Sequence, residues 1–398
     1  MTARAPRARQ RRLLALTTAA LLVLSVAAVG TLALAVGWPE QPTRQSGLAL
    51  TSATATTPVV AVRGAQLVDR RTGERVELLG ANWPGFEYAC IQGRGHNDGG
   101  DVDAAVAAMT EWGMTAVRVP LNQDCWFDER PASAFGTGAE YRATLREWVA
   151  RLTDAGLVVI LDLHWSAPTG VAADGLRPMP DARSITFWSD VAGEYRKHRG
   201  VLFDVFNEPH SRVDPVTGAA VFALDWSCWA EGGCSAPVEN DRSASLSGQT
   251  YVTVGMNALV DAVRSAGATQ PIVLGGLDYA NDLRGWAAAA PDDDQLIAGV
   301  HLYPSKRCGD SACWARELEP LASEVPLLVA EFGQSDGGDA FVRAAWDWAE
   351  DHAVGALAWA WWDITDDTSP DARFALVEGE QFAPRAPSGT AVRELLAD

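Results

Sequence analysis

The sequence predicts a single α/β domain folded as a (β/α)8 barrel, the TIM-barrel class. From Val59 onward, short β-branched runs alternate with amphipathic helical patterns, which is typical of a parallel sheet with crossover helices. Eight such runs occur, and eight strand–helix units over about 250–350 residues fit a closed barrel better than an open sheet. No glycine-rich phosphate motif follows the first run, which argues against a dinucleotide-binding fold.

The expected strands are short apolar runs. In order along the chain they are Glu77–Trp83, Thr115–Leu121, Leu157–Trp165, Val201–Asn207, Pro271–Leu277, Ile297–Tyr303, Leu327–Phe332 and Val354–Trp362. The expected helices include Asp101–Trp112, Glu140–Asp154, Ser184–His198, Ser247–Ala266, Asp339–His352 and Ser388–Leu396. The longest connection, His210–Leu246, follows the fourth strand, and we expect it to shape a cleft at the carboxyl ends of the strands.

The first 38 residues have the pattern of an export signal. Residues 1–12 contain five arginines, and an uncharged run follows from Leu13 to Pro39. This run is long enough to span a bilayer, and Ala33–Ala35 fits a cleavage site, so a retained signal anchor and a cleaved signal peptide both stay open. Residues 39–58 are expected to be a linker and residues 59–398 the barrel, outside the cell, either secreted or tethered to the membrane through the N-terminal segment alone.

The chain is strongly acidic, with a net charge of −19. Because residues 1–12 carry five arginines and no acids, the remainder carries −24. A polyanion of this size repels nucleic acid phosphates and anionic lipid head groups, so we expect a neutral partner and no nucleic acid. The 16 tryptophans suit a carbohydrate partner, because indole faces stack on sugar rings, although we expect most of them in the core.

All six cysteines lie beyond the linker, where an oxidising location favours disulfides. The sequence leaves the connectivity open, but proximity along the chain suggests three pairs: Cys228 with Cys234, Cys308 with Cys313, and Cys90 with Cys125. Zinc is a weaker alternative, because no Cys-x-x-Cys pair or interleaved histidine spacing is present. We therefore expect no metal and no cofactor.

Two glutamates follow or end very apolar runs. Glu208 comes after the fourth expected strand, and Glu331 lies at the end of the seventh. Strand ends carry the reactive residues of this fold, and hydrolysis of a glycosidic bond with retention needs two carboxyl groups about 5–5.5 Å apart. The alternative is a pair of solvated surface glutamates, which the apolar runs before them argue against.

Seven short motifs, in this order and spacing over residues 76–365, resemble glycoside hydrolase family 5, the cellulase-like retaining barrel enzymes. They are Gly80–Glu87, Val117–Pro120, Leu161–Trp165, Asn207–Pro209, His301–Tyr303, Glu331–Gly333 and Leu357–Trp362. Each motif alone is weak evidence for the family, and the resemblance depends on their order and spacing along successive strands. The resemblance implies a single catalytic barrel domain that cleaves a β-linked polysaccharide by a two-step double displacement.

The resemblance also assigns roles to the charged residues. It implies that Glu208 is the general acid/base and Glu331 the nucleophile. It further implies that Arg118 pairs with Glu331 and keeps it ionised, and that Tyr303 donates a hydrogen bond to it. The negative charge of Glu331 is then expected to keep Glu208 protonated.

The remaining polar and aromatic roles follow from the same resemblance. It implies that His301 lies close to the acid/base, that Asn207 holds the 2-hydroxyl of the sugar, and that His164 completes the polar floor. On the eighth strand Trp359 and Trp361 share one face, and gapless matching places Trp359 under the cleaved sugar, with Trp361 as the alternative.

Three further tryptophans, Trp83, Trp126 and Trp165, lie at strand ends or in their loops. They are expected to be neighbouring sugar platforms or to pack under the loops, with equal weight.

The leading hypothesis is a monomeric endo-β-1,4-glucanase acting on β-glucan. A β-mannanase, an exo-β-glucosidase and a glycolipid-cleaving relative stay open, because the motifs define the mechanism better than the sugar. A non-catalytic carbohydrate-binding barrel is the alternative from another class, and the presence of both glutamates and their supporting residues argues against it. A metal-dependent hydrolase is opposed by the lack of a histidine cluster at strand ends.

Overall fold

The computed structural model describes residues 57–128, 134–364 and 370–397. The expected export segment, 1–38, and all but the last two residues of the expected linker, 39–58, lie outside these ranges. The described residues belong to one compact unit, Ser52–Asp398, which contains its own hydrophobic core and a closed barrel and is therefore a complete folding domain. Within the described ranges, no helix combines the length and the hydropathy needed to cross a bilayer.

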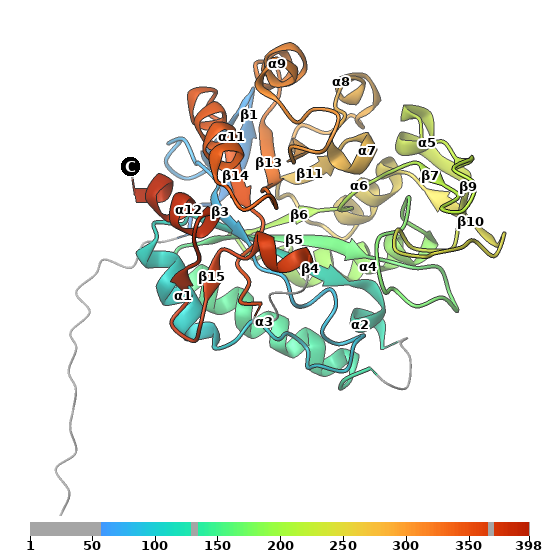
Figure 1. Cartoon of the computed structure of the whole chain (residues 1–398), viewed down its shortest axis with the longest axis horizontal. Coiled ribbons are helices and arrows are strands. Elements are labelled where there is room, and N and C mark those ends of the chain that lie inside the picture. Colours follow the sequence, from blue (N-terminus) through green and yellow to red (C-terminus); the bar gives the residue numbers. More distant parts are fainter. Residues whose placement is uncertain (1–56, 129–133, 365–369, 398) are drawn as a thin grey trace, which may run out of the picture. The chain divides into compact units, whose positions relative to one another are not determined.

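Eight parallel strands close into a barrel, which confirms the predicted fold class (Figure 1). In order around the barrel they are β3 (Leu79–Asn82), β4 (Ala116–Asn122), β5 (Val158–Trp165), β6 (Val201–Asp204), β11 (Ile272–Gly275), β12 (Leu296–Leu302), β13 (Leu327–Phe332) and β14 (Gly355–Ala358). The last strand pairs with the first, so the sheet has no free edge. Each strand falls within two residues of its predicted start, but β6, β11 and β14 end two to four residues earlier than predicted.

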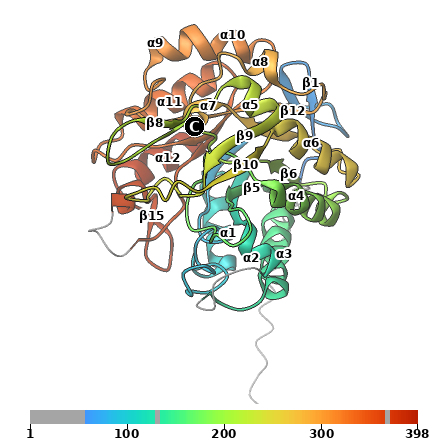
Figure 2. The same ribbon diagram turned by 90° about the vertical axis from the view of Figure 1, so that its right-hand side faces the viewer.

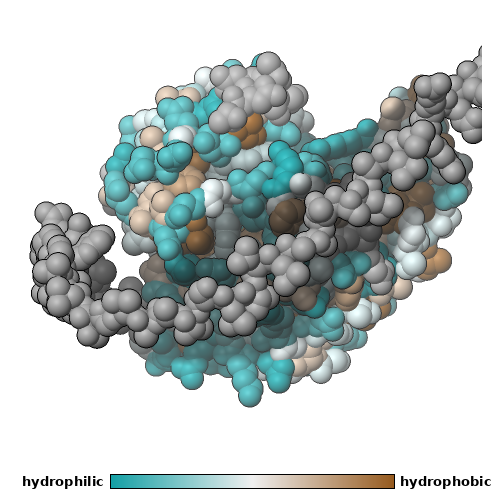
Figure 3. All heavy atoms as spheres, turned by 90° about the horizontal axis from the view of Figure 1, so that it is seen from below, coloured by the Kyte–Doolittle hydropathy of each residue, from teal (hydrophilic) through white to brown (hydrophobic). Residues whose placement is uncertain are grey.

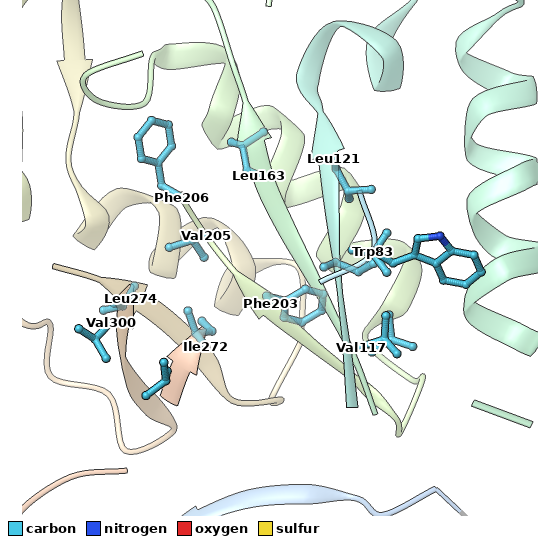
Figure 4. Close-up of a cluster of buried hydrophobic side chains, with 14 of the residues drawn as sticks. Trp83, Val117, Leu121, Leu163, Phe203, Val205, Phe206, Ile272, Leu274 and Val300 are labelled. Atoms are coloured by element: carbon cyan, nitrogen blue, oxygen red, sulfur yellow. The ribbon is translucent and has the colours of Figure 1, made fainter. Parts of the chain in front are cut away.

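The barrel strands are buried on both faces, which explains their continuous apolar runs. Figure 4 shows part of the layer between strands and helices, with Val117, Leu163 and Phe203 among the labelled side chains. Alternate residues such as Ile160 and Leu328 point to a separate cluster inside the barrel. The whole interior is therefore filled by side chains rather than forming a pore.

A hairpin that precedes the barrel closes its amino end. Strands β1 (Val60–Arg63) and β2 (Gln66–Asp69) pair antiparallel, and their Val60 and Leu67 belong to the same buried cluster as the interior barrel residues. The sequence analysis placed the start of the domain here but predicted no strands before Glu77.

Helices pack around the barrel where amphipathic patterns were predicted. The long ones are α1 (Val102–Glu111), α3 (Gly138–Asp154), α4 (Ala182–Tyr195), α6 (Met256–Ser265), α11 (Ala340–Asp351) and α12 (Ser388–Ala397). Their starts follow capping chemistry: Asp101 caps α1, and Thr137 with Glu140 forms a reciprocal capping box at α3.

The prediction of one helix over Ser247–Ala266 was wrong in its first half. Residues Thr250–Val254 form strand β10, which pairs with β9 (Gly232–Pro237), and the helix begins only at Met256 (Figure 2). The segment Thr-Tyr-Val-Thr-Val is β-branched and buries alternate side chains, Tyr251 and Thr253, so its period is that of a strand.

The remaining elements lie mostly in connections at the carboxyl ends of the strands and were not predicted. They are α2 (Gln123–Phe127), β7 (Arg212–Val213), β8 (Ala220–Phe222), α5 (Trp226–Glu231), α7 (Leu277–Ala280), α8 (Trp286–Ala289), α9 (Ser311–Cys313), the π-helical turn η1 (Trp314–Leu318), α10 (Glu319–Ala322), the 3-10 turn η2 (Pro370–Phe374), β15 (Val377–Glu378) and β16 (Ala383–Pro384). The long connection His210–Leu246 is thus an ordered insertion that contains the hairpin β7–β8, the helix α5 and the strand β9, whose partner β10 follows Leu246.

The structure joins all six cysteines in the three predicted disulfides: Cys90–Cys125, Cys228–Cys234 and Cys308–Cys313. The outer surface is otherwise polar, and the face in Figure 3 is mainly hydrophilic with scattered hydrophobic residues. Large exposed hydrophobic side chains among the described residues are few: Phe135, Val213, Val216, Val221 and Val252.

Candidate active site

A cleft of about 1030 Å³ opens at the carboxyl ends of the barrel strands. Glu208, which follows β6, and Glu331, which lies on β13, both line it. One carboxylate oxygen of each, together with a ring nitrogen of His301, lies within 4.8 Å of the others. The two glutamates are therefore a close pair, as double displacement with retention requires, and not surface charges.

Arg118 on β4 is the centre of the charge network below these carboxylates. Its side chain is fully buried, and its Nη1 donates to Glu331 Oε1 at 2.8 Å. Its Nε donates to Asp204 at 2.9 Å, and its Nη2 donates to Asn207 Oδ1 at 2.7 Å. A single rigid guanidinium thus orients the predicted nucleophile and the residue that precedes the predicted acid/base.

Three buried carboxylates face this one cation: Asp162, Asp204 and Glu331. Burial alone lowers the pKa of Arg118, but the three negative charges raise it above its ordinary value, so the guanidinium stays charged. Burial raises the pKa of Asp162 to about 7 and that of Asp204 to about 8.

Asp204 was missed by the sequence analysis. The signal that could have identified it is its position on β6, two residues from Leu202 and therefore on the same interior face of the barrel.

The nucleophile candidate Glu331 accepts hydrogen bonds from two sides. Arg118 donates to Oε1, and the Tyr303 hydroxyl donates to Oε2 at 2.7 Å. Burial, followed by the charges of Glu331 and Glu208, raises the pKa of Tyr303 well above its ordinary value, so this hydroxyl remains a donor. Two donors, one of them the Arg118 cation, stabilise a carboxylate anion at this position.

The acid/base candidate Glu208 has a different environment. Its Oε1 lies 2.9 Å from Nδ1 of His301, whose backbone carbonyl accepts a hydrogen bond from Asn281 at 2.8 Å. Burial raises the pKa of Glu208 to about 7, although the positive charge of Lys306 lowers it. Burial lowers the pKa of His301 to about 3, so its ring is neutral. Glu208 is therefore a carboxyl group that can hold and release a proton near neutral pH.

The backbone around Glu208 is held by an unusual turn. Asp278, Tyr279 and Ala280 are three successive non-glycine residues with positive φ values of 53°, 60° and 57°. The Tyr279 amide donates to the carbonyl of Pro209 at 3.0 Å, and its ring stacks on His210 at 4.3 Å. Such a backbone conformation is costly and is typical of functional sites. No pattern in the sequence identified it.

His164 connects the polar floor to an aromatic platform. Its Nδ1 lies 2.7 Å from Asp162, which fixes the ring, and its Nε2 lies 3.5 Å from the amide nitrogen of Asn207. The ring stacks on Trp359 with centroids 5.5 Å apart and planes 8° apart. Burial lowers the pKa of His164 to about 4. A neutral, fixed imidazole thus supports both Asn207 and the partly exposed Trp359.

The structure separates the predicted tryptophans. Trp359 and Trp165 line the cleft. Trp83 and Trp126 are buried, and Figure 4 shows Trp83 pointing away from the strands toward a helix, where it packs on Trp148. Neither buried ring can serve as a sugar platform.

The alternative placement of Trp361 under the sugar is also wrong. Trp361 is buried and contacts Trp112 and Phe382, whereas Trp362, the next residue, lines the cleft beside Tyr88. The reason is that β14 ends at Ala358, so the two-residue alternation of a strand does not extend over these tryptophans.

Two groups of side chains among the described residues bring metal-ligand atoms together. One is Glu208, His301 and Glu331, where the guanidinium 2.8 Å from Glu331 would repel a cation. The other contains Cys308, Cys313 and Glu317, but both cysteines are in a disulfide and so offer no thiolate. The donor sets therefore favour neither group as a metal site.

Comparisons with known proteins agree with this geometry. A family model described as cellulase (glycosyl hydrolase family 5) matches residues 71–367. Endoglucanase N of Pectobacterium atrosepticum is 21% identical over 334 residues, covering 81% of this chain and 62% of its own length. Endoglucanase 5 of Pectobacterium carotovorum is also 21% identical, over 81% of this chain and 55% of its own. The chain thus spans little more than half the length of these relatives.

Solved structures share the fold. A β-glucanase from Saccharophagus degradans in complex with cellotetraose superposes with a TM-score of 0.62 at 16% identity, covering 86% of this chain and 94% of that one. The catalytic domain of the major endoglucanase from Xanthomonas campestris pv. campestris gives a TM-score of 0.61 at 21% identity, covering 85% and 100%.

Proposed function

Because the chain belongs to glycosyl hydrolase family 5, we propose that it is a retaining endo-β-1,4-glucanase with Glu331 as nucleophile and Glu208 as general acid/base. The observation that carries the proposal is the close pair of glutamates with opposite environments. Glu331 is held by a cation and a hydroxyl, whereas Glu208 is buried beside a neutral histidine. The two positions thus favour an anion and a protonated acid, respectively.

In the first step the Glu331 carboxylate attacks the anomeric carbon, and Glu208 gives its proton to the departing glycosidic oxygen. The leaving sugar departs with a new hydroxyl group, and the remaining sugar is joined to Glu331 as an ester. Arg118 and Tyr303, each hydrogen-bonded to Glu331 in the free enzyme, hold the attacking oxygens in place.

In the second step Glu208 acts as a base. Formation of the ester removes the negative charge of Glu331, so the free energy needed to ionise Glu208 falls. The ionised Glu208 takes a proton from water, and the water oxygen attacks the anomeric carbon from the side that the leaving group vacated. The ester bond to Glu331 breaks, and Glu331 leaves as a carboxylate. Two inversions give net retention. Asn207, held by Arg118, is placed to bind the 2-hydroxyl of the reacting sugar.

The polymeric β-glucan substrate is supported by the cleft and by the relatives. The cleft has aromatic side chains at several points, among them Tyr88, Trp165, Trp359 and Trp362, which suits a run of sugar rings. The relatives are named as endoglucanases, and cellotetraose is the ligand of one structural neighbour. A β-mannan is the second candidate, because a β-mannanase/endoglucanase of Caldicellulosiruptor saccharolyticus is 22% identical over 273 residues.

The nucleophile is tested by Glu331→Gln, assayed on cello-oligosaccharides, mixed-linkage glucan, mannan and aryl glycosides. We expect a loss of turnover on the order of 10⁴-fold with the fold retained. Glu350→Gln, the same change on an exposed position of α11, is the control and should leave turnover unchanged. Equal turnover by Glu331→Gln and the native chain would exclude the assignment. Proton NMR of the first product should show the retained anomer.

We also propose that the chain is a monomer that acts outside the cell. Three disulfides support an oxidising compartment, and residues 1–38 have the pattern of a signal peptide or anchor, followed by a linker over residues 39–58. Mass spectrometry of the mature amino terminus distinguishes cleavage from retention. A cytoplasmic protein with an intact amino terminus and free thiols would contradict the export proposal.

A further inference from the structure

A second cavity, of about 560 Å³, lies at the opposite end of the barrel from the catalytic cleft. It is formed by β1 at the start of the domain and by the segments that lead into β6 and β11, so it opens at the amino ends of the strands. Six of its ten lining residues are basic and none is acidic; the basic ones are Arg70, Arg71, Arg196, Lys197, His198 and Arg199. We call these lining residues the basic pocket.

The sign of this charge is opposite to that of the molecule. The whole chain carries −19, and the catalytic cleft is lined by eight aspartates and glutamates against three arginines and lysines. Charges on the far side of the barrel are weakly felt here, because interactions in physiological salt are screened beyond about 8 Å. An approaching anion therefore meets the local cations rather than the net charge.

Several cations in the basic pocket have no carboxylate partner. Asp69 neutralises Arg71 at 2.7 Å, and Arg196 donates to the backbone carbonyl of Gly193. Burial lowers the pKa of His198, so its ring is not counted as a cation. Over the ranges that the structure describes, no carboxylate lies within ion-pair distance of the remaining arginines and lysine, Arg70, Lys197 and Arg199. All three are exposed, so they are available to an external anion.

The basic pocket is also where the polypeptide enters the domain. The carbonyl of Thr57, the first described residue, accepts a hydrogen bond from Arg71 at 3.0 Å. A Cβ atom on Gly200 would lie 2.5 Å from the Thr57 methyl carbon, so Thr57 is seated directly against the residue that follows Arg199. The first described residue of the chain therefore lies at the rim of this pocket.

The preceding sequence indicates what lies near that rim. Seventeen residues separate Pro39, at the end of the apolar run, from Thr57. They reach at most about 60 Å when extended, and a flexible chain of this length has a mean span of roughly 20–25 Å. If the N-terminal segment is retained as an anchor, this length of chain limits the distance from the membrane to Thr57, at the rim of the basic pocket, to about 60 Å.

We propose that the basic pocket docks on the phosphate-bearing head groups of an anionic phospholipid membrane. Docking there turns the amino end of the barrel toward the bilayer and the catalytic cleft away from it, so a polymeric glucan can reach the cleft unobstructed. The net charge of the chain predicted repulsion from such lipids, but the segregation of charge between the two ends of the barrel reverses that prediction locally. The inference is independent of the proposed glucanase activity.

Vesicle co-sedimentation of the Ser52–Asp398 domain, which contains the complete core, tests the proposal without the apolar segment. The native domain should bind vesicles containing phosphatidylglycerol and not vesicles of phosphatidylcholine alone. The variant Arg70→Gln/Lys197→Gln/Arg199→Gln should bind at least about 30-fold more weakly, since each basic residue near the surface contributes about fivefold. Binding should also weaken as the salt concentration rises.

A matched control removes three exposed arginines elsewhere. Arg316→Gln/Arg343→Gln/Arg393→Gln makes the same change in net charge, and its vesicle binding should stay within about twofold of the native domain. Circular dichroism melting shows whether both variants fold, independently of any activity. Equal weakening by both triple variants would reduce the effect to net charge and overturn the proposal.

Two further outcomes would also overturn it. One is the absence of binding by the native domain to phosphatidylglycerol vesicles. The other is displacement of the vesicles by inorganic phosphate below about 1 mM, which would show a site for a free anion rather than for a membrane surface.

Discussion

Inside the amino end of the barrel the side chains are aliphatic, whereas inside the carboxyl end Arg118 is surrounded by three carboxylates. The two regions are built from the same strands: Leu202 is apolar and Asp204, two residues later, is charged. Burial of apolar area in the amino half stabilises the fold, whereas desolvation of the charges in the carboxyl half destabilises it. Stability and chemistry are therefore separated along the barrel axis rather than between inside and outside.

The largest expected effect is at the centre of the charged half. Arg118→Met leaves Glu331, and Asp162 and Asp204 whenever they are ionised, without their cation. We therefore expect a destabilisation of about 3–5 kcal/mol and a fall in kcat on the order of 10³-fold. Chemical denaturation and steady-state kinetics measure the two effects. An Arg118→Met variant with native kcat would show that the network is not needed to orient Glu331.

The corresponding change in the aliphatic half should affect stability alone. Ile160→Ala removes a fully buried side chain at the amino end and should cost about 2–5 kcal/mol of unfolding free energy. Below its melting temperature the variant should keep the native kcat and pH profile. A shifted pH profile for Ile160→Ala would contradict the claim that the aliphatic half contributes to stability and not to catalysis.

The two halves should also differ in how stability depends on pH. The folded-state pKa values of Asp162 and Asp204, about 7 and 8, lie above the ordinary value of 3.8. The folded state therefore keeps protons that the unfolded state releases, and stability should fall as pH rises from about 4 toward 8. Asp204→Asn should reduce this slope by up to about 1.4 kcal/mol per pH unit, and Ile160→Ala should leave it unchanged. Thermal melts across this range measure the slopes, and an unchanged slope in Asp204→Asn would count against a protonated Asp204.

Activity should report the proton on Glu208. Because the pKa of Glu208 is about 7 and the first step needs its acid form, kcat/KM should fall about tenfold per pH unit above that value. The fall should be much shallower on an aryl glycoside with an activated leaving group, which needs little protonation. Identical alkaline limbs for both substrates would argue against Glu208 as the acid.

The smallest effect should come from the aromatic platform. Trp359→Ala should raise KM for cello-oligosaccharides about 5- to 10-fold, on the order of 1 kcal/mol, through the loss of a stacking face. Trp361→Phe, two residues away and buried, is the matched control and should change the melting temperature more than KM. A larger rise in KM for Trp361→Phe than for Trp359→Ala would indicate that Trp361 is the sugar platform.

Patterns that depend on strand periodicity were predictable. The eight barrel strands and the two glutamates at strand ends were predicted from this periodicity. The partners Arg118, Tyr303 and His301 were named by the resemblance to the family, and the structure brings them together with the glutamates. Asp204 could have been found by the same alternation, because it shares the interior face with Leu202.

Features beyond the strand ends were not predictable by the same rules. Trp359 lines the cleft as expected, but Trp361 was kept as an alternative platform because alternation was extended past the end of the strand. The helix expected over Ser247–Ala266 hid a strand, since both periods fit a short β-branched run. The basic pocket was not predicted, because the net charge of the chain does not say where the basic residues lie on the surface.

The three disulfides all lie at the carboxyl end of the barrel, where the cleft opens. All of them tie connections at the carboxyl ends of the strands: the loops after β3 and β4 through Cys90–Cys125, and two short loops through Cys228–Cys234 and Cys308–Cys313. Cross-links restrict the conformations that these loops can visit, so less entropy is lost when a glycan chain settles among them. In protein made in a reducing cytosol these loops should therefore be less restricted, and reoxidation should recover glycan affinity as well as melting temperature, since a disulfide also restricts the unfolded chain.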